Sequence, residues 1–428
     1  MNNYKNREKI NEIIKFIDIP EIIVLHGARQ VGKTTLMKMT MNYIEKNKKN
    51  DFFYFDLEKE DFLNLCNNGV EEIIKYIKGK KTNNNSENKT FIFIDEIQYL
   101  NNPTSLLKLF YDHYKNNFKL IVSGSSSFAI KSKFKDSLVG RIIDLEIFGL
   151  SFKEFLDFKG LKYDLASNSK LINSELKNIY LEYALYGFYP QVVLTDNLEL
   201  KEIYLKNIIE KYIYKDIRDL AKVKDLEKFN NLIKLLASQS GKLVNINELA
   251  NTLNIARQTI EQYLFILEST YIIKLIRPFH KNIRNELSKM PKIYFEDTGI
   301  LNLLRNKKLN NEMDGNTFEN SIYTYLRREF NINNIYFWRT ISKQEVDFII
   351  NNENIVPAEV KITYQDKLMK NLTFFSKQYQ TKNSYCITIN KKESKHGNIQ
   401  QIYPWEIEKI GVTDKHTNNA NLIYGNNN

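Results

Sequence analysis

Eight residues near the N-terminus have the types and spacing needed to bind a phosphate group. Residues 27–34 match the pattern G-x-x-x-x-G-K-T, in which Gly27 and Gly32 let the backbone curl so that successive N–H groups face an anion. Lys33 would add a positive charge, and the Thr34 hydroxyl would be a ligand of Mg²⁺. The pattern therefore indicates a phosphate-binding loop.

The residues on either side of this loop supply the structural context that such a site needs. The apolar run 22–25 could end a buried strand, and residues 35–39 could continue as a helix whose N-terminus faces the anion. A surface turn that contains Gly-Lys-Thr by chance is the alternative. We expect the nucleotide to be bound by Gly27, Ala28, Arg29, Gln30, Val31, Gly32, Lys33, Thr34 and Thr35.

A second candidate is the pair of acids that follows the apolar run 91–94, which suits a buried central strand. Asp95 would hold Mg²⁺, and Glu96 would orient and deprotonate the water that attacks the γ-phosphate of ATP. Because adjacent strand residues point to opposite sides, one acid can serve the metal while the other reaches the water. Two adjacent acids could also be merely solvated, but the phosphate-loop pattern favours the catalytic interpretation. The expected cofactors are ATP and Mg²⁺.

A further strand, 120–123, leads into the sequence Gly-Ser-Ser-Ser. A polar residue at this strand end would lie between the two motifs and sense the γ-phosphate. We expect this residue to be Ser125, with Ser123 as the alternative.

Composition sets the outer bounds of the interpretation. The chain has 428 residues, 43% of them hydrophobic, which predicts roughly two to four domains with real cores. No apolar run is long enough to span a membrane and no secretory core opens the sequence, so we expect a cytoplasmic protein without a membrane partner. Cys66 and Cys386 lie far apart, and neither they nor the five histidines form a metal pattern. The net charge of +11 is weak support for a nucleic-acid partner, because the excess is mostly lysine dispersed among asparagine.

The middle of the chain changes from one helical pattern to another. Ser151 and Glu154 form a capping-box pattern, and residues 151–222 have the apolar spacing of a helical lid, interrupted at 187–190. Residues 223–290 predict a helix at 226–236, a short helix at 247–253, a helix at 256–269 and a strand at 271–276. This order is typical of a winged helix-turn-helix, which binds DNA or serves as a spacer between proteins. The residues expected to face DNA are Arg257, Gln258, Thr259 and Gln262.

The last part of the chain, 291–410, carries a different set of charged residues. Asp347 lies on one strand of a predicted hairpin, and alternation puts Glu359 and Lys361 on one face of the return strand. Glu319, on a preceding helix, is a further acid. Carboxylates and a lysine at this spacing can bind Mg²⁺ and activate water for phosphodiester cleavage. The same pattern also occurs as an exposed ion-paired hairpin.

These segments together resemble a large family of prokaryotic P-loop proteins of the AAA+ superfamily with a C-terminal domain of unknown function, DUF4143. The resemblance covers nearly the whole chain and rests on blocks at 27–36, 93–98, 124–126, 140–155, 345–348 and 359–361. It implies an ATP-binding core, a helical lid, a winged helix and a nuclease-like fold similar to the PD-(D/E)XK type. By the same resemblance, Arg141 looks like an arginine that reaches a γ-phosphate in its own or a neighbouring subunit. One departure is that relatives tend to carry Gly-Gly-Phe/Tyr-Pro where this chain has Gly-Phe-Tyr-Pro at 187–190.

The sequence therefore predicts an α/β protein with a P-loop parallel-sheet ATPase core and a helical lid, followed by a winged helix and a small α/β nuclease-like domain. The expected boundaries are 1–150 for the core, 151–222 for the lid, 223–290 for the winged helix, 291–410 for the nuclease-like domain and 411–428 for a flexible tail. We expect an ATP-hydrolysing, DNA-associated switch or motor with a possible nuclease site and a possible homo-oligomeric state. The alternative is a signalling or defence switch that holds ATP and recruits a protein partner through its C-terminal domain.

Overall fold

The computed structural model describes residues 4–80, 89–124, 138–217, 223, 225–280, 290–392 and 398–410. The chain folds into two compact units. The first unit consists of Met1–Leu161, Phe188–Lys224 and Glu261–Ile272, and the second of Lys162–Gly187, Asp225–Ile260 and Ile273–Asn428. Each unit is described by itself below.

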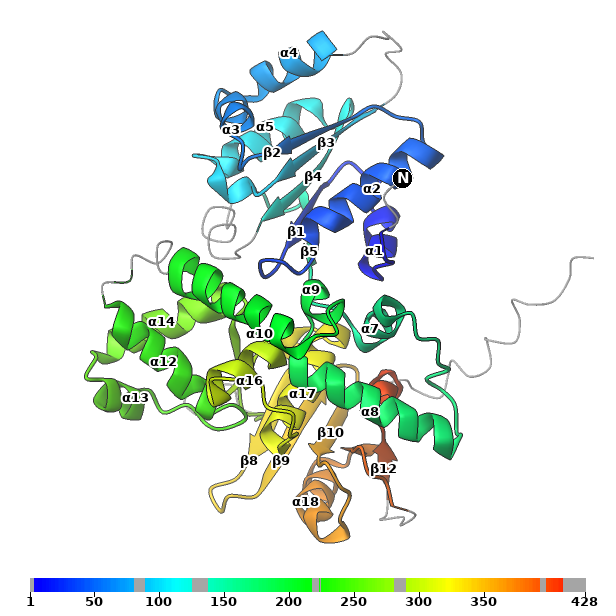
Figure 1. Cartoon of the computed structure of the whole chain (residues 1–428), viewed down its shortest axis with the longest axis vertical. Coiled ribbons are helices and arrows are strands. Elements are labelled where there is room, and N and C mark those ends of the chain that lie inside the picture. The colour runs from blue at the N-terminus through cyan, green and yellow to red at the C-terminus, as the bar shows by residue number, and fades with distance from the viewer. Residues whose placement is uncertain are drawn as a thin grey trace, which may run out of the picture. The chain divides into compact units, whose positions relative to one another are not determined.

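The first unit is built on a five-stranded sheet in the order β2-β3-β4-β1-β5, in which all neighbouring strands are parallel (Figure 1). The strands are β1 (Ile22–His26), β2 (Phe52–Asp56), β3 (Thr90–Asp95), β4 (Phe118–Gly124) and β5 (Ile142–Glu146). Every residue of β1 and β3 is buried, as expected for inner strands of a sheet covered on both faces. Since β4 lies between β1 and β3, the carboxyl ends of these three strands are neighbours.

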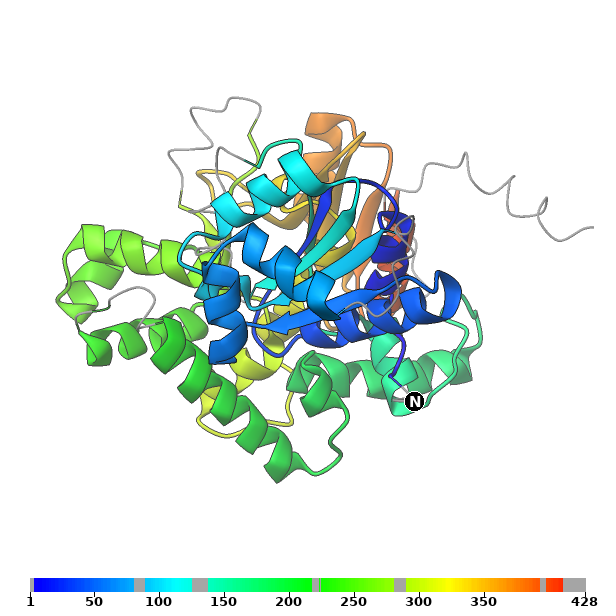
Figure 2. The same cartoon turned by 90° about the horizontal axis from the view of Figure 1, so that it is seen from above.

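Alternate strand residues face the helices on one side of this sheet. Val24, Ile94 and Val122 belong to an apolar cluster with side chains of α3 (Glu60–Asn67), α4 (Val70–Lys80) and α5 (Pro103–Tyr114). Figure 2 shows α5 and α2 on opposite sides of the sheet. The other helices of this unit are α1 (Lys9–Lys15), α2 (Lys33–Asn47), η1 (Ile97–Tyr99), α7 (Phe152–Lys159), α9 (Pro190–Val193), α10 (Leu198–Asn207) and the π-helix η2 (Ile208–Ile217).

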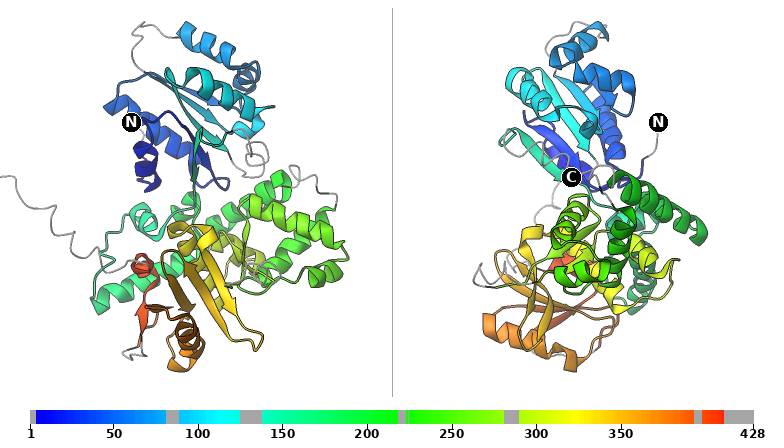
Figure 3. Two further views of the ribbon diagram at one scale, coloured as in Figure 1. Left: turned by 180° about the vertical axis from the view of Figure 1, so that it is seen from behind. Right: turned by 90° about the vertical axis from the view of Figure 1, so that its left-hand side faces the viewer.

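The second unit contains a mixed sheet in the order β12-β11-β10-β9-β8. Strands β8, β9 and β10 pair antiparallel, whereas β10, β11 and β12 pair parallel. The strands are β8 (Ile335–Arg339), β9 (Glu345–Asn351), β10 (Ile355–Val360), β11 (Ser384–Ile387) and β12 (Ile399–Ile402). Figure 3 shows α18 (Lys370–Tyr379, orange) against this sheet, where Leu372 and Phe375 pack with Val346 and Cys386.

Three helices and a strand pair precede this sheet, and the third helix continues into the first unit from Glu261 onward. Helix α12 (Leu226–Ser238) is followed by α13 (Ile246–Leu253), which Asn245 caps and which ends at Asn254 in the left-handed conformation. Helix α14 (Arg257–Ser269) follows, and β6 (Ile273–Ile276) pairs antiparallel with β7 (Lys292–Phe295). The remaining elements of the second unit are α8 (Lys170–Tyr186), α16 (Thr298–Asn306), α17 (Gly315–Glu329), η3 (Ile332–Asn334), η4 (Asp366–Met369) and η5 (Pro404–Lys409).

Local patterns agree closely with these elements. The predicted capping box is present, because Ser151 accepts from the Glu154 N–H while Glu154 accepts from the Ser151 N–H. The helix, short helix, turn, helix and strand expected over 226–276 appear in that order, although the strand begins at Ile273 because Tyr271 has a φ of 58°. Of residues 151–222, expected as one lid, 151–161 and 188–222 belong to the first unit and 162–187 to the second.

Candidate nucleotide-binding site

The loop between β1 and α2 depends on its two glycines. Gly27 has a φ of 152°, and a Cβ there would lie 2.1 Å from the Ile147 carbonyl oxygen. Gly32 has a φ of 101°, and its Cβ would lie 2.7 Å from Nη1 of Arg7. No other residue fits either position without moving these neighbours, so the loop keeps the tight curve that exposes its backbone N–H groups.

Lys33, at the start of α2, points back into this loop. Its Nζ donates hydrogen bonds to the carbonyl oxygens of Gly27, at 3.0 Å, and Ala28, at 2.7 Å. Burial lowers the pKa of Lys33 to about 8, and the nearby charges of Glu96 and Asp95 offset part of that effect. The loop thus holds a cation that an anionic ligand can draw away from the carbonyls.

Asp95, the last residue of β3, lies beside Thr34. Its Oδ2 accepts hydrogen bonds from the Thr34 hydroxyl and from the Tyr54 hydroxyl, both at 2.7 Å. The Ser123 hydroxyl donates to the other carboxylate oxygen. Thr34 and Asp95 together present the oxygen ligands that Mg²⁺ prefers, so the residues fit this ion.

Glu96 has a left-handed backbone, with a φ of 57° and a ψ of 50°. This conformation costs a non-glycine residue on the order of 1 kcal/mol and is concentrated at functional sites. The Glu96 N–H donates to Ser123 Oγ at 3.2 Å, and the Gln98 amide donates to the Glu96 carboxylate. Ser123 therefore contacts both acids from the end of β4.

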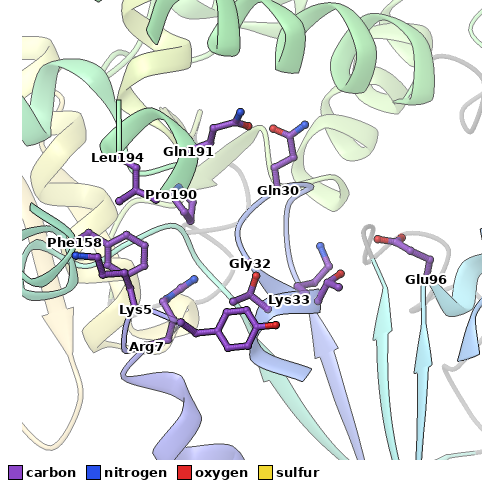
Figure 4. Close-up of a pocket in the computed structure, with 13 residues that line it drawn as sticks. Lys5, Arg7, Gln30, Gly32, Lys33, Glu96, Phe158, Pro190, Gln191 and Leu194 are labelled. Carbon is purple, nitrogen blue, oxygen red and sulfur yellow. The ribbon is translucent and has the colours of Figure 1, made fainter. Parts of the chain in front are cut away.

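A pocket of about 450 Å³ adjoins these groups. In Figure 4, Phe158, Pro190 and Leu194 lie together at one end and Glu96 at the other, with Lys33 between them. The pocket is lined by Tyr4, Lys5, Arg7, Gln30, Gly32, Lys33, Thr34, Thr35, Glu96, Phe158, Pro190, Gln191 and Leu194. It thus has an apolar end and a charged end.

The predicted loop residues differ in where their side chains lie. Gln30, Gly32, Lys33, Thr34 and Thr35 line the pocket, whereas Ala28 and Val31 are buried beside it. The Arg29 guanidinium lies 3.7 Å from the Glu58 carboxylate. Ser125, the expected γ-phosphate sensor, falls outside the described residues, and Ser123 occupies the predicted place between the two motifs.

Arg141 lies at the amino ends of the parallel strands, whereas the phosphate loop lies at their carboxyl ends. Ile22 pairs with Ile142 and His26 with Glu146, so Arg141 precedes the start of β5 while Gly27 follows the end of β1. Five strand residues, Ile22–His26, lie between these two levels, so six steps of about 3.3 Å separate them by roughly 20 Å along the strands. Arg141 instead forms an ion pair with Asp112, with Nε 2.8 Å from Oδ1. In this structure Arg141 does not face the phosphate loop of its own subunit, and a contact of Arg141 with a γ-phosphate, in its own or a neighbouring subunit, stays a prediction.

The acids predicted in the C-terminal part lie together on the β9–β10 hairpin. Lys361 Nζ is 3.0 Å from Asp347 Oδ2 and 2.7 Å from Glu359 Oε1, so the two carboxylates share one ammonium group. The Asp347 carboxylate also accepts from the Val360 N–H at 2.9 Å. Burial and the charge of Asp347 raise the pKa of Glu359 to about 8, although Lys361 opposes this effect.

A second lysine, which the sequence reasoning missed, lies among the same acids. Lys292, 1% exposed, has its Nζ 2.6 Å from Glu345 Oε1, 3.3 Å from Glu319 Oε1 and 3.8 Å from Asp347 Oδ1. Burial opposes its charge, but Glu319, Asp347 and Glu345 raise the pKa of Lys292 overall. Across the described ranges, no three His, Cys, Asp or Glu residues are arranged to hold a metal ion. The hairpin is ion-paired, as the alternative expected, but its Asp347 and Glu359 are buried rather than exposed.

The residues expected to face DNA occupy the first two turns of α14. Arg257, Gln258 and Gln262 are exposed and Thr259 is partly exposed, while Ile260 on the same helix is buried. Within the part of the chain that the structure describes, no helix is long and apolar enough to cross a membrane.

Comparisons with known proteins match three successive segments of the chain. A model described as an AAA domain matches residues 20–156, one described as domain of unknown function DUF8612 matches 177–313, and one described as domain of unknown function DUF4143 matches 314–407. An uncharacterized protein of Methanocaldococcus jannaschii is 29% identical over 357 residues, covering 82% of this chain and 77% of the relative. One of Haemophilus influenzae is 27% identical over 348 residues, covering 79% of this chain and 82% of the relative.

Matches to solved structures include the following two proteins. A Walker-type ATPase of Pyrococcus abyssi matches with a TM-score of 0.46 and 14% identity, covering 71% of this chain and 97% of that chain. Cdc6p of Pyrobaculum aerophilum matches with a TM-score of 0.31 and 11% identity, covering 72% and 98%. The family matches agree with the parallel sheet and its phosphate loop: residues 20–156 match an AAA domain and residues 314–407 match a DUF4143 domain.

Proposed function

We propose that the protein binds ATP with Mg²⁺ and hydrolyses it. The observation that carries this proposal is the direct hydrogen bond between Thr34 and Asp95 beside the Lys33 ammonium, at the edge of a pocket that Glu96 also lines. Phosphates would lie at this charged end. The apolar end of the pocket, with Phe158 and Leu194, suits a nucleobase.

Each group has a distinct task in this proposal. Lys33 leaves the carbonyls of the loop and donates to the phosphate oxygens. Thr34 and Asp95 would supply oxygen ligands to Mg²⁺, and the ion would neutralise negative charge on the phosphates. Glu96 orients the attacking water and accepts its proton, while Ser123 donates to the Asp95 carboxylate and accepts from the Glu96 backbone N–H, which fixes that carboxylate and the backbone of Glu96.

Two substitutions test this proposal. Lys33→Ala should abolish nucleotide binding, and Glu96→Gln should bind ATP while hydrolysing it roughly 10² to 10⁴-fold more slowly, because the amide keeps the shape but cannot accept a proton. Glu72→Gln, on α4 and paired with Lys75, is a matched control that should behave as the wild type. Turnover near the wild-type rate in Glu96→Gln would refute the catalytic assignment.

We further infer that nucleotide state controls an interaction with DNA, so that the protein works as a switch or motor. The support is the α13–turn–α14 arrangement followed by the β6–β7 pair, together with the exposed Arg257, Gln258 and Gln262. The competing proposal is a signalling or defence switch whose C-terminal domain recruits a protein. Binding to duplex DNA that weakens steeply with salt favours the first proposal, and its absence favours the second.

A nuclease function of the C-terminal domain is a weaker proposal. Its support is the contact of Asp347 and Glu359 with Lys361, but Lys292 already balances part of the negative charge at this place. Cleavage of DNA that requires Mg²⁺ or Mn²⁺ and is lost in Asp347→Asn would support it. No cleavage by the wild type, with or without ATP, would leave the domain as an interaction module.

A further inference from the structure

Arg7 lies beneath the phosphate loop although it precedes the segment 20–156 that matches the AAA domain. Only 4% of the residue is exposed, and all three guanidinium nitrogens donate hydrogen bonds. Nε donates to Glu154 Oε1 at 2.9 Å, Nη1 to the Val31 carbonyl at 2.7 Å and Nη2 to the Phe148 carbonyl at 2.9 Å. One side chain thus connects the phosphate loop, the residues after β5 and helix α7.

The chemistry of these contacts requires an arginine. The guanidinium is planar and presents its donors in a fixed fork, whereas a lysine has one nitrogen on a flexible stem and could reach only one or two of these acceptors. The carboxylate of Glu154 neutralises the buried charge, and this carboxylate also accepts from the Glu8 N–H at 2.7 Å.

The contact with Val31 has a direct effect on the adjacent glycine. The peptide unit between Val31 and Gly32 is planar and trans, so its C=O and N–H groups point in opposite directions. Arg7 fixes the Val31 C=O and thereby turns the Gly32 N–H away from itself, and Gly32 lines the pocket. Arg7 also occupies the space where a side chain at residue 32 would lie, since a Cβ there would be 2.7 Å from Nη1.

We propose that Arg7 is a positioning residue that holds the phosphate loop in its nucleotide-binding conformation. The proposal rests on the proposed ATP-binding function of this pocket. Without Arg7, the Val31–Gly32 peptide is free to rotate, and nucleotide binding must then also order the loop. Because this ordering is needed for substrate and transition state alike, loss of Arg7 should raise KM and Kd much more than it lowers kcat.

The test compares Arg7→Lys and Arg7→Met with the wild type. Loss of charge-assisted hydrogen bonds should raise the Kd for a fluorescent ATP analogue about tenfold or more, with kcat within a few-fold. Amide hydrogen exchange of residues 27–34, measured without nucleotide, should be faster in both variants. Glu72→Gln is the matched control, because it changes an ion pair with Lys75 on α4 and none of the Arg7 contacts, and it should change neither quantity.

The exchange measurement separates this proposal from the proposed function. If the wild type binds no nucleotide, the ATP-binding proposal fails, while faster exchange at 27–34 in Arg7→Lys still supports the role of Arg7. A folded Arg7→Lys protein with wild-type Kd and wild-type exchange overturns the positioning role. Should both Arg7 variants fail to fold, Glu154→Gln replaces them, because it keeps the shape of the partner but removes its charge. Amide exchange at 27–34 should then be faster than in the wild type, to a smaller degree than expected for the Arg7 variants. Unchanged exchange in Glu154→Gln also overturns the positioning role of Arg7.

Discussion

Raising the pH above 8 should weaken nucleotide binding, because Lys33 then loses its proton. Burial lowers the pKa of Lys33 to about 8 in the nucleotide-free protein, and bound phosphates, being negative, would raise it. The affinity for the nucleotide is therefore highest below pH 8, where Lys33 is protonated. Above pH 8 the affinity falls by up to about tenfold for each pH unit. At pH 9.5 the Kd should be about 30-fold higher than at pH 7.

The measurement is a titration with a non-hydrolysable fluorescent ATP analogue from pH 6.5 to 9.5 at constant ionic strength. A phosphate monoester group completes its own ionisation near pH ~6, so the nucleotide contributes little to a change above pH 8. Lys33→Arg provides the control, since its guanidinium stays charged throughout this range. We expect this variant to bind more weakly than the wild type but with an affinity that does not vary with pH.

A pH-independent Kd would contradict the link between the burial of Lys33, the loss of its proton and its contact with the phosphates. A wild-type Kd that stays constant to pH 9.5, in protein shown to remain folded by circular dichroism, would mean that Lys33 keeps its proton or does not contact the phosphates. A decline of equal size in Lys33→Arg would instead assign the titration to another group.

Three further predictions concern residues outside the loop. If Arg141 completes the site of a neighbouring subunit, ATPase activity per protein should rise with protein concentration, and Arg141→Ala should lose roughly 10³-fold or more in rate while still binding nucleotide; a rate independent of both would exclude this role. Replacing Arg257 and Gln258 with alanine should weaken duplex-DNA binding and flatten the plot of log affinity against log salt by about one for each phosphate group that the variant no longer binds, whereas unchanged binding in the folded variant would place the DNA interface elsewhere. Lys292→Met should lower the free energy of unfolding by about 3 to 5 kcal/mol in urea titrations, because buried carboxylates lose their partner; a decrease below about 1 kcal/mol would contradict the described cluster.

The phosphate loop and the acids after β3 could be predicted because each is a local pattern. Seven or eight adjacent residues set the glycine conformations, and an apolar run sets the strand that ends at Asp95. The contacts that hold these groups were not predictable in the same way. Tyr54 reaches Asp95 and Arg7 reaches Glu154 across long stretches of chain, and no local spacing reveals such pairs.

The surroundings of Arg141 and Lys292 could not be predicted for the same reason. Arg141 and the phosphate loop flank neighbouring strands. Because β1 and β5 are parallel, the residue before β5 and the loop after β1 lie at opposite ends of the strands. Lys292 gave one signal in the sequence, a single charge at the start of the apolar run Lys-Ile-Tyr-Phe, but its partners come from α17 and β9. Which acids surround such a lysine depends on the three-dimensional fold.

The polarity of the parallel sheet restricts the symmetry of any assembly that uses Arg141. Arg141 lies where the strands begin, and the phosphate loop lies where they end. A contact between them in two subunits therefore joins two different surfaces of the protein. If each pair of subunits makes this contact only once, the interface is heterologous, and repeating it produces either a closed ring or an open helical filament. In a ring, a neighbouring subunit supplies Arg141 to every nucleotide site. In a filament, the site at one end lacks this arginine. The number of nucleotide sites without an arginine would therefore distinguish a ring from a filament.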